Sequence, residues 1–314
     1  MPEFFNRVRT KLRLMLRASR IRSLGGELRG SGAWDAMDRL GIPGYGTELL
    51  RLDFLPDVGH VPAWEAPDPV HARLAGILDR DAGLQAACLE RCLGYADALA
   101  AWPVDAPDRS FLPWIRNEFL SQADMLALYG MIRDLKPVRY LEIGCGVSTR
   151  VAVAAVADGA LRTEIVCVDP SPRAALPPNG VRHLAARLEL AVEEVLRLAV
   201  PGTVLFFDGS HRSFPGSDVT VFFLALIPAL PPGVVVHIHD IFLPGDYPRD
   251  AAPRYWSEQY LLAAWLLGGA SGIEVLLPGA HLEAQPAKWA GIAPHLRAEP
   301  GPVTRFSSFW FRKT

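Results

Sequence analysis

Ionisable side chains lie just beyond two apolar segments of the sequence, and their types could bind a metal ion or move a proton. PPGVVVHIHDIF carries an apolar run that ends in His237, His239 and Asp240, and LFFDGSH places Asp208 and His211 after another such run. Carboxylate and imidazole ligands suit divalent ions such as Mn²⁺, Fe²⁺ or Zn²⁺. An imidazole oriented by a carboxylate is equally a general base. A third interpretation, in which these residues only cap strand ends, also stays open.

The alternation of side chains along a strand separates these residues. Successive side chains of a strand point to opposite faces, and this rule weakens at its last residues. His237 and His239 therefore point one way, and Ile238 and Asp240 the other. Because His237 lies deeper in the strand, we expect it to be a hydrogen-bonded histidine of the core. We expect Asp208, His211, His239 and Asp240 to converge as the catalytic group.

A glycine-rich turn provides a second candidate site. In YLEIGCGVST, Gly144 and Gly146 allow the backbone to turn tightly and to approach a ligand closely. Ser148 or Thr149 is expected to cap the helix that follows. Thr149 stands where the dinucleotide fingerprint GxGxxG has its third glycine.

Two acids flank this turn and bear on the ligand. Glu142 precedes it, and Asp169 lies 23 residues beyond Gly146, near the spacing expected of a carboxylate that binds a ribose. S-adenosylmethionine (SAM) needs no phosphate cradle, and its amino group favours a nearby carboxylate such as Glu142. NAD fits the order of the elements but prefers the third glycine. In the structural alternative, Glu142 only caps the loop.

The elements that must position these residues are alternating strands and helices. From about residue 111 the pattern predicts βαβ units and a mostly parallel, Rossmann-like sheet with an antiparallel last strand. Right-handed crossovers bring the C-terminal ends of parallel strands to one edge, where ligands bind. The predicted strands are 138–143, 163–169, 180–186, 203–208, 233–240, 272–277 and 305–312, and the helices between them are 121–135, 148–158, 188–199, 218–230 and 255–267.

An ordered set of motifs resembles class I SAM-dependent methyltransferases. The segments RYLEIGCGVST, VCVDPSP, LFFDGSH, SDV, LPPGVVVHIHDIF, DYP, WSEQYLL and SFWFRK are most similar to the bacterial branch of cephalosporin-hydroxylase-like and macrocin O-methyltransferase-like proteins. The resemblance covers residues 111–314. It implies that the glycine-rich loop holds the methionine end of SAM and that Asp169 holds the ribose hydroxyls. Asp208 is expected beside the cofactor as well.

The resemblance also implies a divalent metal ion and an activity. Related enzymes bind the ion with the acid after the fourth strand and the pair after the fifth, which correspond to Asp208, His239 and Asp240. Many relatives have a carboxylate where this chain has His239. We expect a SAM-dependent O-methyltransferase that acts on a small hydroxylated acceptor, such as a sugar, natural-product or surface-polysaccharide intermediate. The alternatives are a noncatalytic SAM- or nucleotide-binding module that acts through its N-terminal region, and an NAD-linked oxidoreductase.

The remainder of the chain predicts its organisation and partners. Residues 1–24 carry seven Lys/Arg and one acid on an amphipathic pattern, which suits peripheral contact with an anionic membrane or packing within a homo-oligomer. Residues 25–110 form a mainly helical accessory region, and 111–314 the catalytic domain.

The net charge of −2 gives no reason to expect a nucleic-acid partner. We expect reduced thiols and a cytoplasmic protein, with peripheral association with a membrane as the alternative. Cys88 and Cys92 are expected on the buried face of a helix. An acceptor pocket or ordinary loop and helix packing is expected of Tyr247, Arg254, Tyr255, Trp256 and Glu258.

Overall fold

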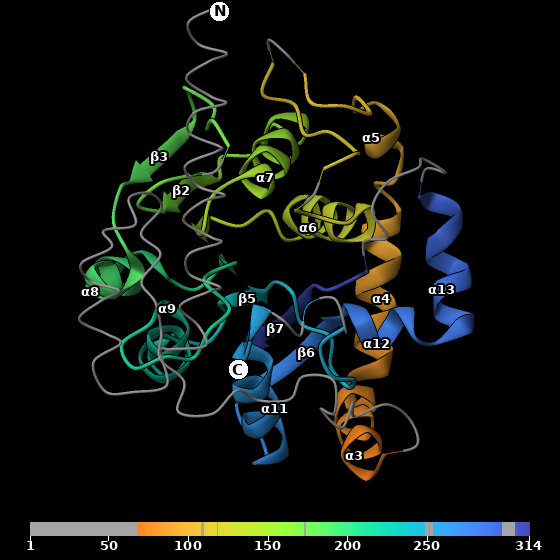
Figure 1. Ribbon diagram of the computed structural model, residues 1–314. Coiled ribbons are helices and arrows are strands. Elements are labelled where there is room, and N and C mark those ends of the chain that lie inside the picture. The colour runs from red at the N-terminus through yellow and green to blue at the C-terminus, as the bar shows by residue number, and fades with distance from the viewer. Residues whose placement is uncertain are drawn as a thin grey trace, which may run out of the picture. The chain divides into compact units, whose positions relative to one another are not determined.

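Seven strands form a single sheet in the order β3-β2-β1-β4-β5-β7-β6 (Figure 1). β1 to β5 are parallel, and β7 runs antiparallel between β5 and β6. The sequence prediction of a mostly parallel sheet with an antiparallel last strand is therefore confirmed. The strands are β1 (Arg139–Ile143), β2 (Glu164–Val168), β3 (Val181–Leu184), β4 (Thr203–Phe207), β5 (Val235–Ile238), β6 (Ile273–Pro278) and β7 (Phe309–Lys313).

The computed structural model describes residues 68–107, 110–117, 119–172, 174–248, 251, 254–296 and 305–314. The predicted basic helix 1–24 and the first part of the accessory region 25–110 lie outside the described residues. Within the described part of the chain, no helix is both long and apolar enough to cross a membrane.

Helices cover both faces of the sheet because alternate strand residues point to opposite sides. Tyr140 and Phe206 pack in one buried cluster with α4, α6 and α7, whereas Leu141 and Phe207 pack in a second cluster with α3, α8, α9 and α11. Figure 1 shows these two groups of helices on either side of the strands. The helices are α3 (Pro69–Leu78), α4 (Ala82–Leu93), α5 (Asp97–Ala100), α6 (Gln122–Leu135), α7 (Val147–Asp158), α8 (Leu188–Leu198), α9 (Asp218–Val221), α10 (Ile227–Ala229), α11 (Glu258–Leu267), α12 (Gly279–Glu283) and α13 (Pro286–Ile292).

Helix α6 begins at a capping residue and packs closely against α4, which precedes it in the chain. The Ser121 hydroxyl caps it by accepting a hydrogen bond from the Asp124 amide at 2.9 Å. Gly130 lets α4 approach closely, because a Cβ there would lie 2.6 Å from the Cα of Cys92. Cys88 and Cys92 are buried free thiols on α4, as the helical spacing predicted.

One predicted helix is interrupted. The segment 218–230 is a short α-helix, then a π-helical turn over Phe222–Leu226, then a further helical turn. A π-helical turn leaves no mark in an apolar run such as VFFLALI, so the sequence pattern could not reveal it. Helices α12 and α13 were not predicted.

Candidate active site

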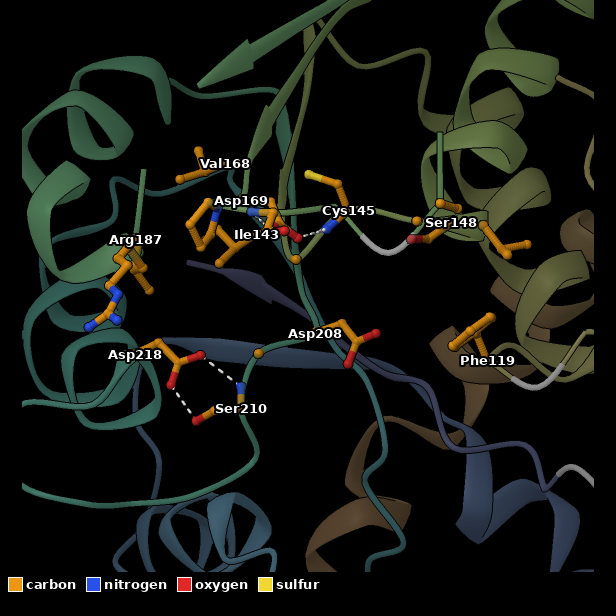
Figure 2. Close-up of a pocket in the computed structure, with 18 of the residues that line it drawn as sticks. Phe119, Ile143, Cys145, Ser148, Val168, Asp169, Arg187, Asp208, Ser210 and Asp218 are labelled. Atoms are coloured by element: carbon orange, nitrogen blue, oxygen red, sulfur yellow. Dashed lines mark hydrogen bonds between the residues drawn. The ribbon is translucent and has the colours of Figure 1, made fainter. Parts of the chain in front are cut away.

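A cavity of about 410 Å³ lies at the C-terminal ends of β1, β2 and β4 (Figure 2). Its walls come from the glycine-rich loop, the residues that follow β2 and β4, and the beginning of α8. Phe119 and Leu120, which precede α6, contribute a further wall. This is the sheet edge at which the sequence predicted ligand binding.

The glycine-rich loop is shaped by two different requirements. Gly144 has φ +82°, and a Cβ there would lie 1.9 Å from the carbonyl oxygen of Asp208, so only glycine fits. At Gly146 a Cβ would meet open space. Helix α7 begins directly after Gly146, whose amide donates to Thr149 Oγ1 at 3.1 Å. Thr149 therefore closes the turn, while Ser148 lines the cavity.

Glu142 lies beneath this loop, outside the cavity lining. Its side chain is fully buried, and Oε2 accepts from the Thr149 hydroxyl at 2.5 Å and from the Cys167 thiol at 3.4 Å. Oε1 has no hydrogen-bond partner among the described residues. Burial raises the pKa of Glu142 to about 7, against the opposing effect of the hydroxyl groups around it. Of the two roles considered for Glu142, contact with the amino group of SAM and support of the loop, these hydrogen bonds correspond to support of the loop.

Asp169 stands at the end of β2 and lines the cavity. Its Oδ2 accepts from the Cys145 amide at 2.8 Å, and its Oδ1 accepts from the Ser171 amide at 2.6 Å (Figure 2). The carboxylate thus joins the glycine-rich loop to the loop after β2. It also presents acceptor oxygens at the position expected for a ribose-binding acid.

Three of the four predicted catalytic residues gather beside the cavity. His211 Nε2 lies 3.2 Å from Asp208 Oδ1 and 3.7 Å from Asp240 Oδ2. One ligand atom from each residue lies within 4.8 Å of those of the other two. Asp208 belongs both to this cluster and to the lining of the cavity, so the cluster adjoins the cavity.

His239 adjoins the cluster without joining that group of three. Its Nε2 donates to the carbonyl oxygen of Phe119 at 3.2 Å and lies 3.7 Å from Asp240 Oδ1. The side chain is buried, and Nδ1 has no partner in the described part of the chain. Burial by itself lowers the pKa of His239, but the neighbouring charges, Asp240 first, outweigh it and raise the pKa to about 9.

His237 lies in the core, as side-chain alternation predicted. It is fully buried, its Nε2 lies 3.0 Å from the Ser308 hydroxyl, and its ring stacks on Phe206 with centroids 4.2 Å apart. Burial lowers its pKa well below the usual value. The imidazole is therefore neutral and structural.

The backbone at the cluster adopts conformations that non-glycine residues rarely take. His211 has φ +62° and Asp240 has φ +55°. Such strained residues persist only where the surrounding structure holds them in place, and they concentrate at functional sites. Ser307 contributes to this by donating to Asp240 Oδ1 at 3.2 Å.

Two contacts at the site were not predicted. Asp218 lines the cavity and accepts from the Ser210 amide at 2.7 Å, which holds the loop after β4. Glu258, expected only as part of an acceptor pocket, accepts a hydrogen bond from His211 Nδ1. The motifs SDV and WSEQYLL contain both residues, but nothing in their spacing indicates which side chain each would contact.

Residues 141–241 match the family model described as a methyltransferase domain. No curated protein matches the chain. Among solved structures, the S-adenosylhomocysteine-bound methyltransferase PaMTH1 of Podospora anserina is 19% identical, with a TM-score of 0.39 over 72% of this chain and 88% of that one. The methyltransferase MycE from the mycinamycin biosynthetic pathway, solved with Mg, S-adenosylhomocysteine and mycinamycin VI, is 18% identical, with a TM-score of 0.34 over 58% of this chain and 47% of MycE. CmcI, solved with Mg and SAM, is 14% identical, with a TM-score of 0.40 over 69% of this chain and 84% of CmcI.

The matched residues run from β1 to the end of β5 and include the glycine-rich loop, Asp169, and the cluster of Asp208, His211 and Asp240. The family match therefore falls on the same segments that build the cavity and the cluster. Over residues 141–241 the chain is thus similar to methyltransferase domains.

Proposed function

We propose that the domain transfers the methyl group of SAM to a hydroxyl group of a small acceptor, with a divalent metal ion held by Asp208, His211 and Asp240. One observation carries the proposal: Asp208 lines the cofactor cavity and is also a member of the ionisable cluster. An acceptor oxygen bound at the cluster is therefore next to the cofactor cavity.

The cavity has features that suit SAM. Its volume of about 410 Å³ lies within the range of small-molecule sites. Gly146 leaves open space at the turn, and Asp169 presents its carboxylate to the cavity. Thr149, whose hydroxyl bonds within the loop, stands where the dinucleotide fingerprint has its third glycine, the one that lets the helix pack closely on the strand, so the fingerprint of an NAD site is incomplete. These points favour SAM over NAD.

The cluster also has the donor set and the charge that a divalent ion requires. Two carboxylates and one imidazole offer oxygen and nitrogen ligands, which favour Mn²⁺, Fe²⁺ or Zn²⁺ over Mg²⁺. His211 is surrounded by the carboxyl groups of Asp208, Asp240 and Glu258. The imidazoliums of His211 and His239 balance at most two of these three carboxylates, and uncompensated buried charge is strongly unfavourable. A divalent cation would balance it.

The chain's own residues have distinct parts in this proposal. A divalent ion supplies, when bound, a Lewis acid that lowers the pKa of a coordinated hydroxyl. By holding the ion, Asp208, His211 and Asp240 would position an acceptor beside the cavity. Such positioning contributes up to about 7–11 kcal/mol in the best intramolecular reactions. The sulfonium leaves as a neutral thioether, so no acid is needed for the leaving group. His239, with its raised pKa, adds a positive charge next to Asp240.

A metal-free general base is the second candidate, because the hydrogen bond between His211 and Glu258 is that of an oriented imidazole. The charges around His211 argue against it. Burial by itself lowers the pKa of His211, but Glu258 and Asp208 outweigh this effect and raise the pKa well above its usual value. A histidine that stays protonated at neutral pH is a poor base.

Binding and turnover of the full-length protein test the proposal. Calorimetry with SAM, S-adenosylhomocysteine and NAD identifies the cofactor, and transfer from radiolabelled SAM to a panel of sugars, phenols and aliphatic alcohols tests the reaction. We expect SAM binding, and methyl transfer to oxygen that a chelator abolishes and Mn²⁺ restores. Binding of NAD alone would contradict the cofactor assignment. SAM binding without transfer to any acceptor would favour a noncatalytic module, and transfer that resists chelation would favour the metal-free base.

A further inference from the structure

Glu258 is a buried carboxylate whose position calls for an explanation. It is the first residue of α11, where the positive end of the helix dipole favours an acid. The side chain has no exposed surface, and its Oε2 has no partner among the described residues. A carboxyl group is costly to bury in this way, so the one strong contact it makes, with His211, is the feature to interpret.

That contact is reinforced by the backbone on both sides. The Ser257 amide donates to the His211 carbonyl oxygen at 2.7 Å, and the Ser213 amide donates to Ser257 Oγ at 2.9 Å. The Trp256 ring lies against the imidazole, with centroids 4.4 Å apart. The residues after β4 are thus fastened to the beginning of α11. This fastening accounts for how His211 is held at a positive φ.

The hydrogen bond determines which nitrogen of His211 faces the cluster. Because Nδ1 donates to Glu258, Nε2 is directed to Asp208 at 3.2 Å and to Asp240 at 3.7 Å. Once the imidazolium of His211 gives up its Nε2 proton, the proton held on Nδ1 leaves the lone pair on Nε2. Carboxylates commonly orient metal-binding histidines through this second nitrogen.

We infer that Glu258 is a positioning residue: it keeps the proton of His211 on Nδ1 and turns Nε2 toward Asp208 and Asp240 as a ligand atom. The inference rests on the proposed function of that cluster. It adds a fourth residue, from a different element, to the three that the cluster contains. Glu258 acts through His211 and does not line the cofactor cavity.

Metal affinity of two variants tests the inference without any acceptor. Glu258→Ala removes the hydrogen-bond acceptor, and Glu258→Gln keeps a neutral one. Glu164→Gln is the control, because Glu164 begins β2 and so lies at the opposite edge of the sheet. Mn²⁺ binding to the full chain is measured by calorimetry. We expect affinity to fall about 10- to 100-fold in Glu258→Ala, less in Glu258→Gln, and not in the control. SAM affinity should stay unchanged in all three.

Nitrogen-proton correlation spectra of ¹⁵N-histidine protein, recorded without metal, provide an independent measurement. His211→Asn identifies the His211 signals. We expect a downfield, slowly exchanging Nδ1 proton in the wild type and in the control, and its loss in Glu258→Ala. Unchanged His211 signals and unchanged Mn²⁺ affinity in folded Glu258→Ala protein would overturn the inference and leave the proposed function standing. If the wild type binds no Mn²⁺, the proposed metal is wrong, and the Nδ1 signal alone then decides the role of Glu258.

Discussion

Replacing Glu142 by glutamine should change how the stability of the protein depends on pH. The carboxyl group is fully buried beneath the glycine-rich loop, and burial raises its pKa from 4.5 to about 7. In the unfolded chain the same group is solvated. Folding therefore shifts its protonation in the pH range between these two values, and Glu142→Gln removes the shift.

The sign and size follow from linkage. Between about pH 4.5 and pH 7 the native state binds more protons at Glu142 than the unfolded state, so stability falls as pH rises through this window. The pKa values differ by about 2.5 pH units, and at about 1.4 kcal/mol per unit the full loss well above pH 7 is about 3.5 kcal/mol. Below pH 4.5 the carboxyl group is neutral in both states and contributes nothing to the pH dependence.

Urea unfolding of wild type and variant across pH 4.5–8 measures this effect. We expect the free energy of unfolding of Glu142→Gln, relative to wild type, to rise by about 3 kcal/mol from the acidic to the alkaline end. Taking the difference cancels the other titrating groups. Glu164→Gln, the same substitution at an exposed side chain, is measured in parallel as the control. Parallel curves for wild type and Glu142→Gln would show that the buried carboxyl group does not titrate in this window, and the reasoning would be refuted.

Three further outcomes are expected. Asp169→Asn should weaken SAM binding roughly 10- to 150-fold in calorimetry with the fold retained, because a charge-assisted hydrogen bond contributes about 1.5–3 kcal/mol; unchanged affinity would contradict its assignment to the ribose. Mn²⁺ affinity should fall as the pH is lowered from 8 to 6, because the pKa values of His211 and Asp240 are both raised and protons compete with the ion; an affinity independent of pH would count against these ligands. His237→Ala should lower the free energy of unfolding by about 2–5 kcal/mol and leave SAM affinity intact, since it opens a cavity in the core; a loss of SAM binding without a loss of stability would place His237 in the site instead.

The sequence predicted the sheet well because its strands carry strong local signals. β1, β2, β4 and β5 are buried apolar runs bounded by glycine, proline or acidic residues, and each was located to within two residues at either end. The start of β7 was predicted wrongly. The predicted strand begins at Arg305, but regular strand pairing begins at Phe309. Phe306 to Ser308 are buried and bonded to α6 and α12 instead, which is a tertiary preference that no local pattern reveals.

The sequence predicted where the candidate site lies, but not how its histidine side chains are oriented. The ends of β4 and β5 meet because the strands are parallel neighbours, which the strand order implies. The orientation of each imidazole depends on distant residues. His239 turns to the Phe119 carbonyl and His211 to Glu258, across separations of 120 and 47 residues. Side-chain alternation cannot resolve such contacts, because it ceases to hold where the strand ends.

The antiparallel strand explains how the cluster is held at its far side. β7 pairs with β5 so that Phe309 is opposite Ile238, and the Ile241 amide donates to the Ser307 carbonyl oxygen at 2.9 Å just beyond this pair. The Ser307 hydroxyl thereby reaches Asp240. The Ser307 and Ser308 amides donate to the buried Asp124, at 3.1 and 2.8 Å, which ties this strand to the start of α6. A parallel strand here would present its opposite end at the cluster. The antiparallel direction of β7 therefore places Ser307, which holds Asp240. In the same way, the beginning of α11 places Glu258, which holds His211.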